Sequence, residues 1–357
     1  MGSLMRGLRL VLAASLLVAV APAAQVVNAG QPTLAQLIGQ KLVVRMEGTT
    51  PSADLLGRIR RGEIGGVVLF GSNLTTRAAL IALTTKLHAA ARAGGQPHFL
   101  IAVDQEGGSV KRIPWAPPTL SAPAMGRIGS ASVARTQGAD TGAALHALGI
   151  DIDFAPVADI ATTNGFMYRD GRTWSISAVK TALLADAFAT GLESKGVRPS
   201  MKHFPGLAFA TRNTDASVVT IAMSKTRLAP GLKPYQTAIG HHIPMIMLSN
   251  ATYPAYDAVN AAGWSPAINR LLRGQLGFTG VTITDSLTGT AHARGRPVSA
   301  LATGAARAGT DMILLTGSEA STSATFATLL TKVRQGTILT ATLRASYARI
   351  VAMKAGF

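Results

Sequence analysis

The stretch that decides the fold is Pro199-Ser200-Met201-Lys202-His203-Phe204-Pro205-Gly206, which continues into a loop reaching Asn213-Thr214-Asp215. A short apolar run ends in a cation and an imidazole, and a Pro-Gly pair turns the chain immediately afterwards. This pattern predicts a buried strand with Lys202 and His203 at its carboxyl end, followed by a long loop. Barrels of parallel strands carry their active sites at that end.

Eight short apolar runs of this kind are distributed along the chain. Polar residues do not interrupt them, which is typical of strands that are buried on both faces. The predicted strands are Lys41–Glu47, Gly66–Phe70, Phe99–Asp104, Asp151–Pro156, Pro199–Phe204, Pro244–Ser249, Val281–Asp285 and Asp311–Thr316.

Between these runs, apolar residues recur at positions i, i+3 and i+4, and glycine follows several of the segments, as at helix ends. Eight strands alternating with helices predict an α/β fold, a (β/α)₈ barrel of the TIM type in a single domain. An open doubly wound sheet is the alternative, but no Gly-x-Gly-x-x-Gly follows the first strand. The predicted helices are Leu55–Arg61, Thr75–Ala93, Ser132–Leu148, Ala178–Lys195, Leu232–Ile239, Ala267–Leu276, Val298–Ala308 and a final set from about Ala320 onward.

The composition favours a packed enzyme-sized core over a disordered or nucleic-acid-binding chain. Of the 357 residues, 48% are apolar and 14% charged, and the net charge is +17. No long Lys/Arg run and no aromatic-rich basic strand is present, so we expect no nucleic-acid partner. A basic exterior suits contact with an anionic cell-wall polymer. We expect a monomer.

The first 29 residues are interpreted as an export signal, and residues 30–357 as the barrel. Arg6 and Arg9 precede the apolar run Leu10–Val20, and Ala21-Pro22-Ala23 offers small residues for cleavage. The run is shorter than the roughly 20 residues of a membrane span, so no membrane contact is expected beyond this segment, whether it is cleaved or retained. The absence of cysteine excludes disulfides and lipid attachment through a cysteine. We therefore expect a secreted or cell-envelope protein.

Polar residues follow most of the predicted strands at their carboxyl ends, which meet on one face of a barrel. This arrangement predicts an enzyme that handles a hydroxyl-rich substrate with carboxylates. No metal-ligand spacing, phosphate-binding loop or Gly-x-Ser-x-Gly elbow is present, so neither a metal nor a cofactor is predicted. The strand-end residues are Glu47, Asp104-Gln105-Glu106, Asp159, Lys202-His203, Asn250 and Asp285-Ser286.

These residues lie in motifs that resemble glycoside hydrolase family 3, and in particular its single-domain β-N-acetylhexosaminidase branch. The resemblance covers nearly all of the chain after the signal. Any one motif is a weak signal, but five in the same order at barrel-like spacing are a strong one. The motifs are Gly65–Gly71, Ala102–Gly108, Asp153–Asp159, Lys202–Gly206 and Thr284–Leu287.

The resemblance implies specific roles. Asp285 would be the nucleophile of a retaining glycosidase, which forms a glycosyl-enzyme intermediate. Lys202 and His203 would hydrogen-bond the sugar and orient the nucleophile. Further substrate contacts are implied for Asp104, Arg112 and Arg172, with Arg169 as a nearby rival for the last.

The chain also departs from this branch. The branch carries an Asp-x-His after the Pro-Gly turn, and its histidine serves as the acid/base. When the loop is aligned with the motif of the branch without a gap, Asp215 stands at the position of that histidine. When a two-residue insertion is allowed, Asp215 matches the aspartate of the motif and Ser217 replaces the histidine. Ser109 stands where the branch usually has an arginine, and Gly289 replaces a methionine near the nucleophile.

Three interpretations of the missing histidine follow. Asp215 is itself the general acid/base, which requires its pKa to be raised. Alternatively, another acid such as Glu106 extends into the active site and acts as the acid/base. In the third interpretation, the barrel has lost hydrolytic activity and only binds sugar. The implied activity is removal of β-linked N-acetylglucosamine from cell-wall or chitin-type sugars. A β-glucosidase and a catalytically silent carbohydrate-binding barrel are the alternatives.

Overall fold

A computed structural model describes Gly2 and residues 31–357, and the predicted export signal lies outside the described residues. Eight parallel strands form one sheet in the order β11-β8-β7-β6-β3-β2-β1-β12. A parallel bridge between Ile283 and Met312 joins the two outer strands and closes the sheet into a barrel. The strands are β1 (Leu42–Arg45), β2 (Gly66–Leu69), β3 (Leu100–Val103), β6 (Ile152–Asp153), β7 (Arg198–Phe204), β8 (Met245–Leu248), β11 (Val281–Thr284) and β12 (Ile313–Leu315).

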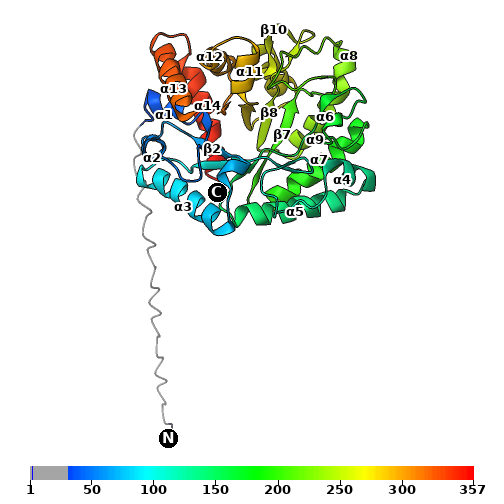
Figure 1. Ribbon diagram of the computed structural model, residues 1–357, viewed down its shortest axis with the longest axis horizontal. Coiled ribbons are helices and arrows are strands. Elements are labelled where there is room, and N and C mark those ends of the chain that lie inside the picture. The colour runs from blue at the N-terminus through cyan, green and yellow to red at the C-terminus, as the bar shows by residue number, and fades with distance from the viewer. Residues whose placement is uncertain (1, 3–30) are drawn as a thin grey trace. The chain divides into compact units, whose positions relative to one another are not determined.

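Helices follow one another around the barrel in chain order (Figure 1). The prediction of a (β/α)₈ barrel in one domain is therefore confirmed, and each predicted strand corresponds to one barrel strand. The helices of eight residues or more are α2 (Ala53–Arg60), α3 (Arg77–Ala93), α5 (Ala131–His146), α7 (Ala178–Glu193), α9 (Lys233–Gly240), α12 (Val298–Ala308), α13 (Glu319–Arg334) and α14 (Thr340–Lys354). The shorter α10 (Pro266–Arg270) lies within the predicted helix region Ala267–Leu276 apart from its first residue.

The barrel core has two layers because successive side chains of a strand point to opposite faces. Val43, Val68, Met247 and Ile283 belong to a cluster inside the barrel. The strand neighbours of Val43, Val68 and Met247 belong to the larger cluster outside it, whereas Ile283 is flanked by the buried threonines Thr282 and Thr284. This alternation explains why the strands read as unbroken apolar runs.

Several short elements were not predicted. The helices α1 (Leu34–Gly39), α4 (Ala122–Ile128), α6 (Phe166–Arg169), α8 (Lys225–Leu228) and α11 (Leu287–Ala293) occupy loops or strand ends. A small antiparallel pair, β4 (Gln105–Gly107) and β5 (Val110–Lys111), follows β3, and a second pair, β9 (Thr252–Tyr253) and β10 (Asp257–Ala261), follows β8. In the described part of the chain, no helix is both long and apolar enough to cross a membrane.

Candidate active site

A cavity of about 420 Å³ opens at the carboxyl ends of the barrel strands. All seven predicted site residues line it: Asp104, Arg112, Arg172, Lys202, His203, Asp215 and Asp285. Phe70, Met167, Met247 and Leu314 add apolar surface to the same wall. Five of the predicted strand-end residues do not line the cavity: Glu47, Gln105, Glu106, Asp159 and Asn250. Glu47 is exposed to solvent, whereas Asn250 is buried and its amide donates to the carbonyl of Ser286 at 2.6 Å.

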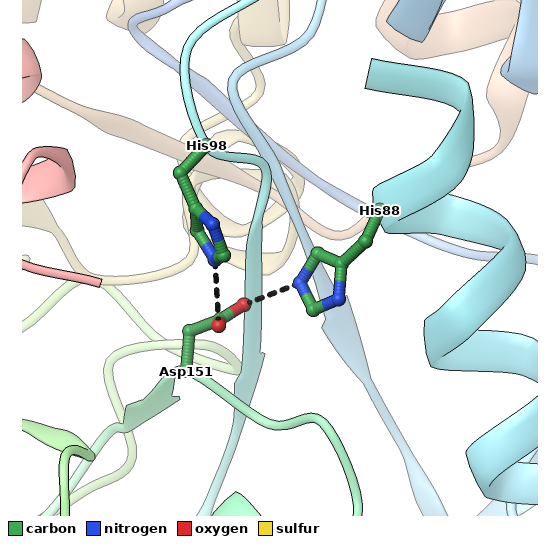
Figure 2. A group of neighbouring side chains, drawn as sticks. All are labelled: His88, His98 and Asp151. Carbon is green, nitrogen blue, oxygen red and sulfur yellow. Dashed lines mark hydrogen bonds and ion pairs between the residues drawn. The ribbon is translucent and has the colours of Figure 1, made fainter. Parts of the chain in front are cut away.

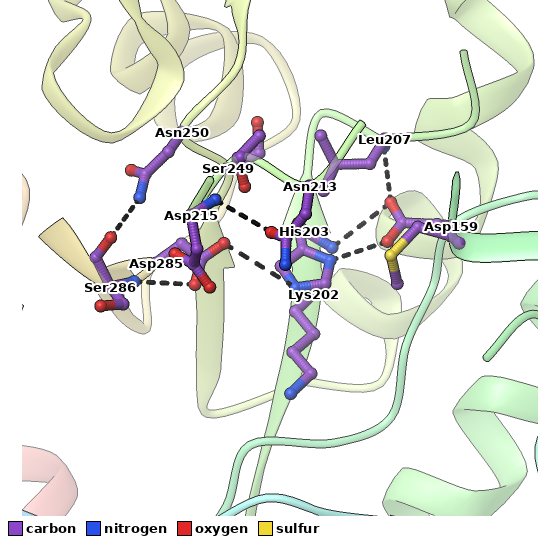
Figure 3. A network of polar contacts seen from close by, with 12 residues as sticks. Asp159, Lys202, His203, Leu207, Asn213, Asp215, Ser249, Asn250, Asp285 and Ser286 are labelled. Carbon is purple, nitrogen blue, oxygen red and sulfur yellow. Dashed lines mark hydrogen bonds and ion pairs between the residues drawn. The ribbon is translucent and has the colours of Figure 1, made fainter. Parts of the chain in front are cut away.

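Asp285 begins a line of three polar side chains that leads from the cavity to a buried aspartate (Figure 3). It follows β11 directly, and the Ser286 backbone N–H donates to its Oδ1 at 2.7 Å. Its Oδ2 lies 4.0 Å from Nε2 of His203, whose Nδ1 in turn lies 2.7 Å from Oδ2 of Asp159. Asp159 is fully buried and also accepts the Leu207 N–H at 2.6 Å. The imidazole is thereby held in one orientation toward Asp285.

A buried network of charges fixes the opposite wall. Lys202 Nζ donates to Asp104 Oδ1 at 2.6 Å and contacts Glu106 Oε1 at 2.7 Å, while Arg172 holds Glu106 through two nitrogens at 2.6 and 2.8 Å. Burial would lower the pKa of Lys202, but the charges of Asp104 and Glu106 outweigh it and raise that pKa. Burial would likewise raise the pKa of Glu106, but Lys202 and Arg172 hold it at about 2.

With its pKa held at about 2, Glu106 is ionised at neutral pH and therefore unsuited to donating a proton, and it does not line the cavity. The arrangement therefore argues against Glu106 as an alternative acid. Arg172 lines the cavity, whereas its rival Arg169 points away and donates to the carbonyls of Asn164 and Thr211, both at 2.7 Å. Arg112 lies over the Phe70 ring and 3.7 Å from Asp104 Oδ2.

Asp215 lies on the loop after β7 and lines the same cavity as Asp285 (Figure 3). Asp215 is exposed to solvent, and it also lines the cavity. Partial desolvation, together with the negative charge of Asp285, raises the pKa of Asp215 to about 7, and nearby His203 acts in the opposite direction. Ser217, which would replace the histidine in the alignment with a two-residue insertion, does not line the cavity.

The loop that carries Asp215 is held on two sides. The Phe166 N–H donates to the carbonyl of Ala210 at 2.8 Å, and the Thr290 hydroxyl donates to the carbonyl of Thr214 at 3.0 Å. Gly289 of α11 faces the same loop, because a Cβ at this position would lie 2.5 Å from the carbonyl oxygen of Asp215. The absence of a side chain at position 289 thus makes room for the Asp215 backbone.

Asp153 is a buried acid that the sequence analysis did not single out. It ends β6 below the charged network; its Oδ1 accepts the Gln105 N–H at 2.9 Å, and its Oδ2 has no partner. Burial raises the pKa of Asp153 to about 8, so the carboxyl is mainly protonated at neutral pH. The sequence signal that could have pointed to this buried acid is its position inside an otherwise apolar predicted strand.

Asp153→Asn should change stability in a pH-dependent way. The unfolded carboxyl ionises near pH 4, whereas the folded pKa is about 8, so the wild-type protein loses stability as pH rises between these values. We expect Tm to change by less than about 2 °C at pH 5 and the variant to gain several degrees over wild type at pH 9. Thermal unfolding at both pH values measures this, and an equal difference at both would contradict it.

A (β/α)₈ barrel with several carboxylates and cations in a polar cavity at the carboxyl ends of its strands is typical of enzymes, and paired carboxylates suit the hydrolysis of glycosidic bonds. Comparison with known proteins identifies the family. The pattern of the glycosyl hydrolase family 3 N terminal domain matches residues 33–353. The chain belongs to this family of glycoside hydrolases.

Individual relatives agree with this assignment. The chain is 33% identical to a secreted glycosyl hydrolase of Arthroderma benhamiae, and the match covers 90% of this chain and 93% of that protein. It is 32% identical to a beta-hexosaminidase of Nitrosospira multiformis, and that match covers 77% of this chain and 79% of the relative. The structure of a beta-N-acetylhexosaminidase from Beutenbergia cavernae superposes with a TM-score of 0.84 at 28% identity, covering 91% of this chain and 99% of that one.

One structural relative is longer than this chain. A family 3 beta-N-acetylglucosaminidase from a Paenibacillus strain superposes with a TM-score of 0.86 at 29% identity. The match covers 91% of this chain but 63% of that protein, so the chain spans less than two thirds of it.

Proposed function

We propose that this protein is a retaining glycoside hydrolase that removes β-linked N-acetylglucosamine, with Asp285 as nucleophile and Asp215 as acid/base. One observation carries the proposal. The carboxylates Asp215 and Asp285 line one cavity, and the pKa of Asp215 is raised to about 7, in part by the negative charge of Asp285. A retaining mechanism requires such a pair, in which one carboxylate attacks and the other carries a proton.

The chemistry proceeds in two steps. Asp285 attacks the anomeric carbon and forms a glycosyl ester, while Asp215 gives its proton to the departing glycosidic oxygen. Asp215, now ionised, then takes a proton from water, and the resulting hydroxide equivalent attacks the anomeric carbon and releases Asp285. His203 lies near Asp285 and, held by Asp159, keeps the nucleophile aligned.

The charged network on the opposite wall is proposed to hold the sugar. Asp104 is already paired with Lys202, and its carboxylate is placed to accept hydrogen bonds from sugar hydroxyls. Arg112 and Arg172 both line the cavity and offer donors to substrate oxygens. Because Lys202, Glu106 and Arg172 are locked together, these donors are held in place before the sugar binds.

The sugar is inferred from the relatives. The Nitrosospira protein is a beta-hexosaminidase and the Beutenbergia structure is a beta-N-acetylhexosaminidase, which favours N-acetylglucosamine over glucose. Cell-wall or chitin-derived oligosaccharides are the proposed source of that sugar. A β-glucosidase and a silent sugar-binding barrel remain the alternatives that the assay must distinguish.

Purified protein should be assayed with paired nitrophenyl β-glycosides of N-acetylglucosamine and of glucose. We expect kcat/KM for the N-acetylglucosaminide to exceed that for the glucoside by at least about tenfold. The reverse preference would assign a β-glucosidase. Binding of N-acetylglucosamine with no turnover of either glycoside would assign a silent barrel.

Gly289→Ala should impair hydrolysis by displacing Asp215. The new Cβ would lie 2.5 Å from the carbonyl oxygen of Asp215, so the loop must shift and the carboxyl moves with it. We expect kcat/KM to fall by about tenfold or more on alkyl glycosides, which need protonation, and by much less on dinitrophenyl glycosides. Steady-state kinetics on both substrates measure the difference.

Gly240→Ala is the matched control for this prediction. Gly240 ends α9, and a Cβ there would meet no atom within 4 Å. The control variant should retain wild-type rates on both substrates. Equal rates for Gly289→Ala and wild type on alkyl glycosides would show that the loop tolerates the added methyl group without moving Asp215.

We also propose that the protein is exported and acts outside the cytoplasm. The signal-like sequence and the similarity to a secreted Arthroderma glycosyl hydrolase support this, and the net charge of +17 suits contact with anionic cell-wall polymers. Intact-mass measurement of protein from the culture medium should give a new N-terminus between about residues 24 and 30. Recovery of only the uncleaved chain, in the membrane fraction, would instead indicate a retained anchor.

A further inference from the structure

Two histidines and one aspartate meet at the amino-terminal end of the barrel, away from the strand ends that carry the cavity (Figure 2). His88 lies in α3, His98 comes two residues before β3, and Asp151 directly precedes β6. Three separate chain segments therefore contribute one side chain each. Nothing in the proposed hydrolysis uses these residues.

The side chains converge through the atoms that bind metals. Nε2 of His88 lies 3.0 Å from Oδ2 of Asp151, and Nε2 of His98 lies 2.8 Å from Oδ1. All potential ligand atoms of the cluster lie within 4.8 Å of one another. A backbone hydrogen bond also holds the carboxylate of Asp151 in place, because the Ile101 N–H donates to its Oδ2 at 2.7 Å.

The cluster is enclosed but reachable from solvent. The side chain of Asp151 is 8% exposed, that of His88 14% and that of His98 30%. Both histidines line a small surface cavity of about 210 Å³. The His98 ring also stacks on Phe357, with centroids 4.9 Å apart, and this contact limits its rotation. A cation would have an entry path and ligands already oriented.

A simple pair of hydrogen bonds is the competing explanation, and one such pair is present elsewhere: His241 contacts Asp186 at 2.7 Å on the surface. That pair has a single histidine. In the cluster, two imidazoles face the same carboxylate, so each must keep a proton on Nε2 to avoid placing a lone pair against the negative charge. A cation between them replaces both protons and satisfies all three ligands.

We propose that His88, His98 and Asp151 bind one divalent cation of the zinc class, with water completing the coordination. Two imidazole nitrogens and a carboxylate are ligands that Zn²⁺ accepts. Bonds of roughly 2.0–2.2 Å in a tetrahedron separate ligand atoms by about 3.3 Å. The histidine–carboxylate distances of 3.0 and 2.8 Å are close to this value, and ligand atoms that now lie up to 4.8 Å apart must approach one another when the cation binds. The cation would join α3 to the segments before β3 and β6 and stabilise this end of the barrel.

The test uses the full chain without a polyhistidine tag, stripped with a chelator and titrated with Zn²⁺ by calorimetry. We expect one tight equivalent per chain. We also expect a Tm increase of about 5 °C when free Zn²⁺ is near 100 times Kd. His98→Gln, which changes the most exposed ligand, should weaken binding by at least about tenfold and remove the Tm increase, and His88→Gln should do the same.

His241→Gln is the matched control, since it removes a histidine–aspartate pair that lacks the second imidazole. It should bind Zn²⁺ as wild type does. Absence of saturable binding in wild type, or equal affinity in His98→Gln and wild type, would overturn the proposal and place any bound zinc elsewhere. Because the readouts are binding and Tm, the result does not depend on whether the protein hydrolyses glycosides.

Discussion

Asp285→Asn should lower kcat/KM on every glycoside by about 10⁴-fold or more while leaving the fold intact. The amide has nearly the shape of the carboxylate but is a poor nucleophile, so the glycosyl ester cannot form. The Ser286 N–H that donates to Oδ1 can donate equally to an amide oxygen. Steady-state rates on an activated aryl glycoside, with Tm as the check on folding, measure the effect.

Asn250→Ala provides a comparison for this result. Asn250 lies next to the cavity and donates to the Ser286 carbonyl, but it does not line the cavity. Its loss should affect stability more than turnover, since buried hydrogen bonds to Ser286 and Thr290 disappear. Wild-type rates in Asp285→Asn would remove Asp285 from the role of nucleophile.

Asp215→Ala should have the second-largest effect, and its size should depend on the leaving group. Glycosides with poor leaving groups need a proton at the first step and should lose about 10²–10⁴-fold in kcat/KM. Dinitrophenyl glycosides need little protonation and should be glycosylated nearly as fast as by wild type. Added azide should then restore turnover, because it attacks the glycosyl ester without a general base and yields a glycosyl azide.

The pH dependence provides an independent readout of the same residue. The acid must be protonated to act, so wild-type kcat/KM should fall as pH rises through about 7, the raised pKa of Asp215. The Asp215→Ala variant should lack this alkaline limb. Equal losses on all leaving groups, with no rescue by azide, would indicate a structural or substrate-binding role for Asp215.

The fold was predictable because its signals are local. Strands buried on both faces read as uninterrupted apolar runs, and β8 and β11 lie within the runs that predicted them. The pairs β4–β5 and β9–β10 were missed because their strands are not apolar runs and are too short to show a reliable alternation. β6 has only two residues where a longer strand was expected, since the chain leaves the ladder soon after Asp153.

The candidate site was predictable where a residue follows a strand directly. Asp285 and Lys202 reach the cavity from strand ends, and Asp104 follows β3. The partnership of Glu106 with Arg172 was not predictable, because it joins residues 66 positions apart through a fold-dependent contact. The cluster of His88, His98 and Asp151 was missed for the same reason: its ligands are not spaced as any sequence motif for a metal.

The environment of Asp215 was the least predictable part. The sequence indicated that an aspartate stands near the position of the missing histidine, but not whether it reaches the nucleophile. The structure brings it into the cavity through a loop held by Thr290 and accommodated by Gly289. The raised pKa follows from that placement and from the charge of Asp285, and neither can be read from local sequence.

In the proposed mechanism, Asp285 forms a covalent bond to the sugar. An activated 5-fluoro derivative of N-acetylglucosamine slows hydrolysis of the glycosyl ester and lets it accumulate, so digestion and mass spectrometry can locate the attached sugar. We predict one sugar per chain, attached to Asp285 in the peptide containing Thr284-Asp285-Ser286. Attachment to another carboxylate, or rapid hydrolysis of the natural glycoside with no trapped sugar on any peptide, would contradict the account.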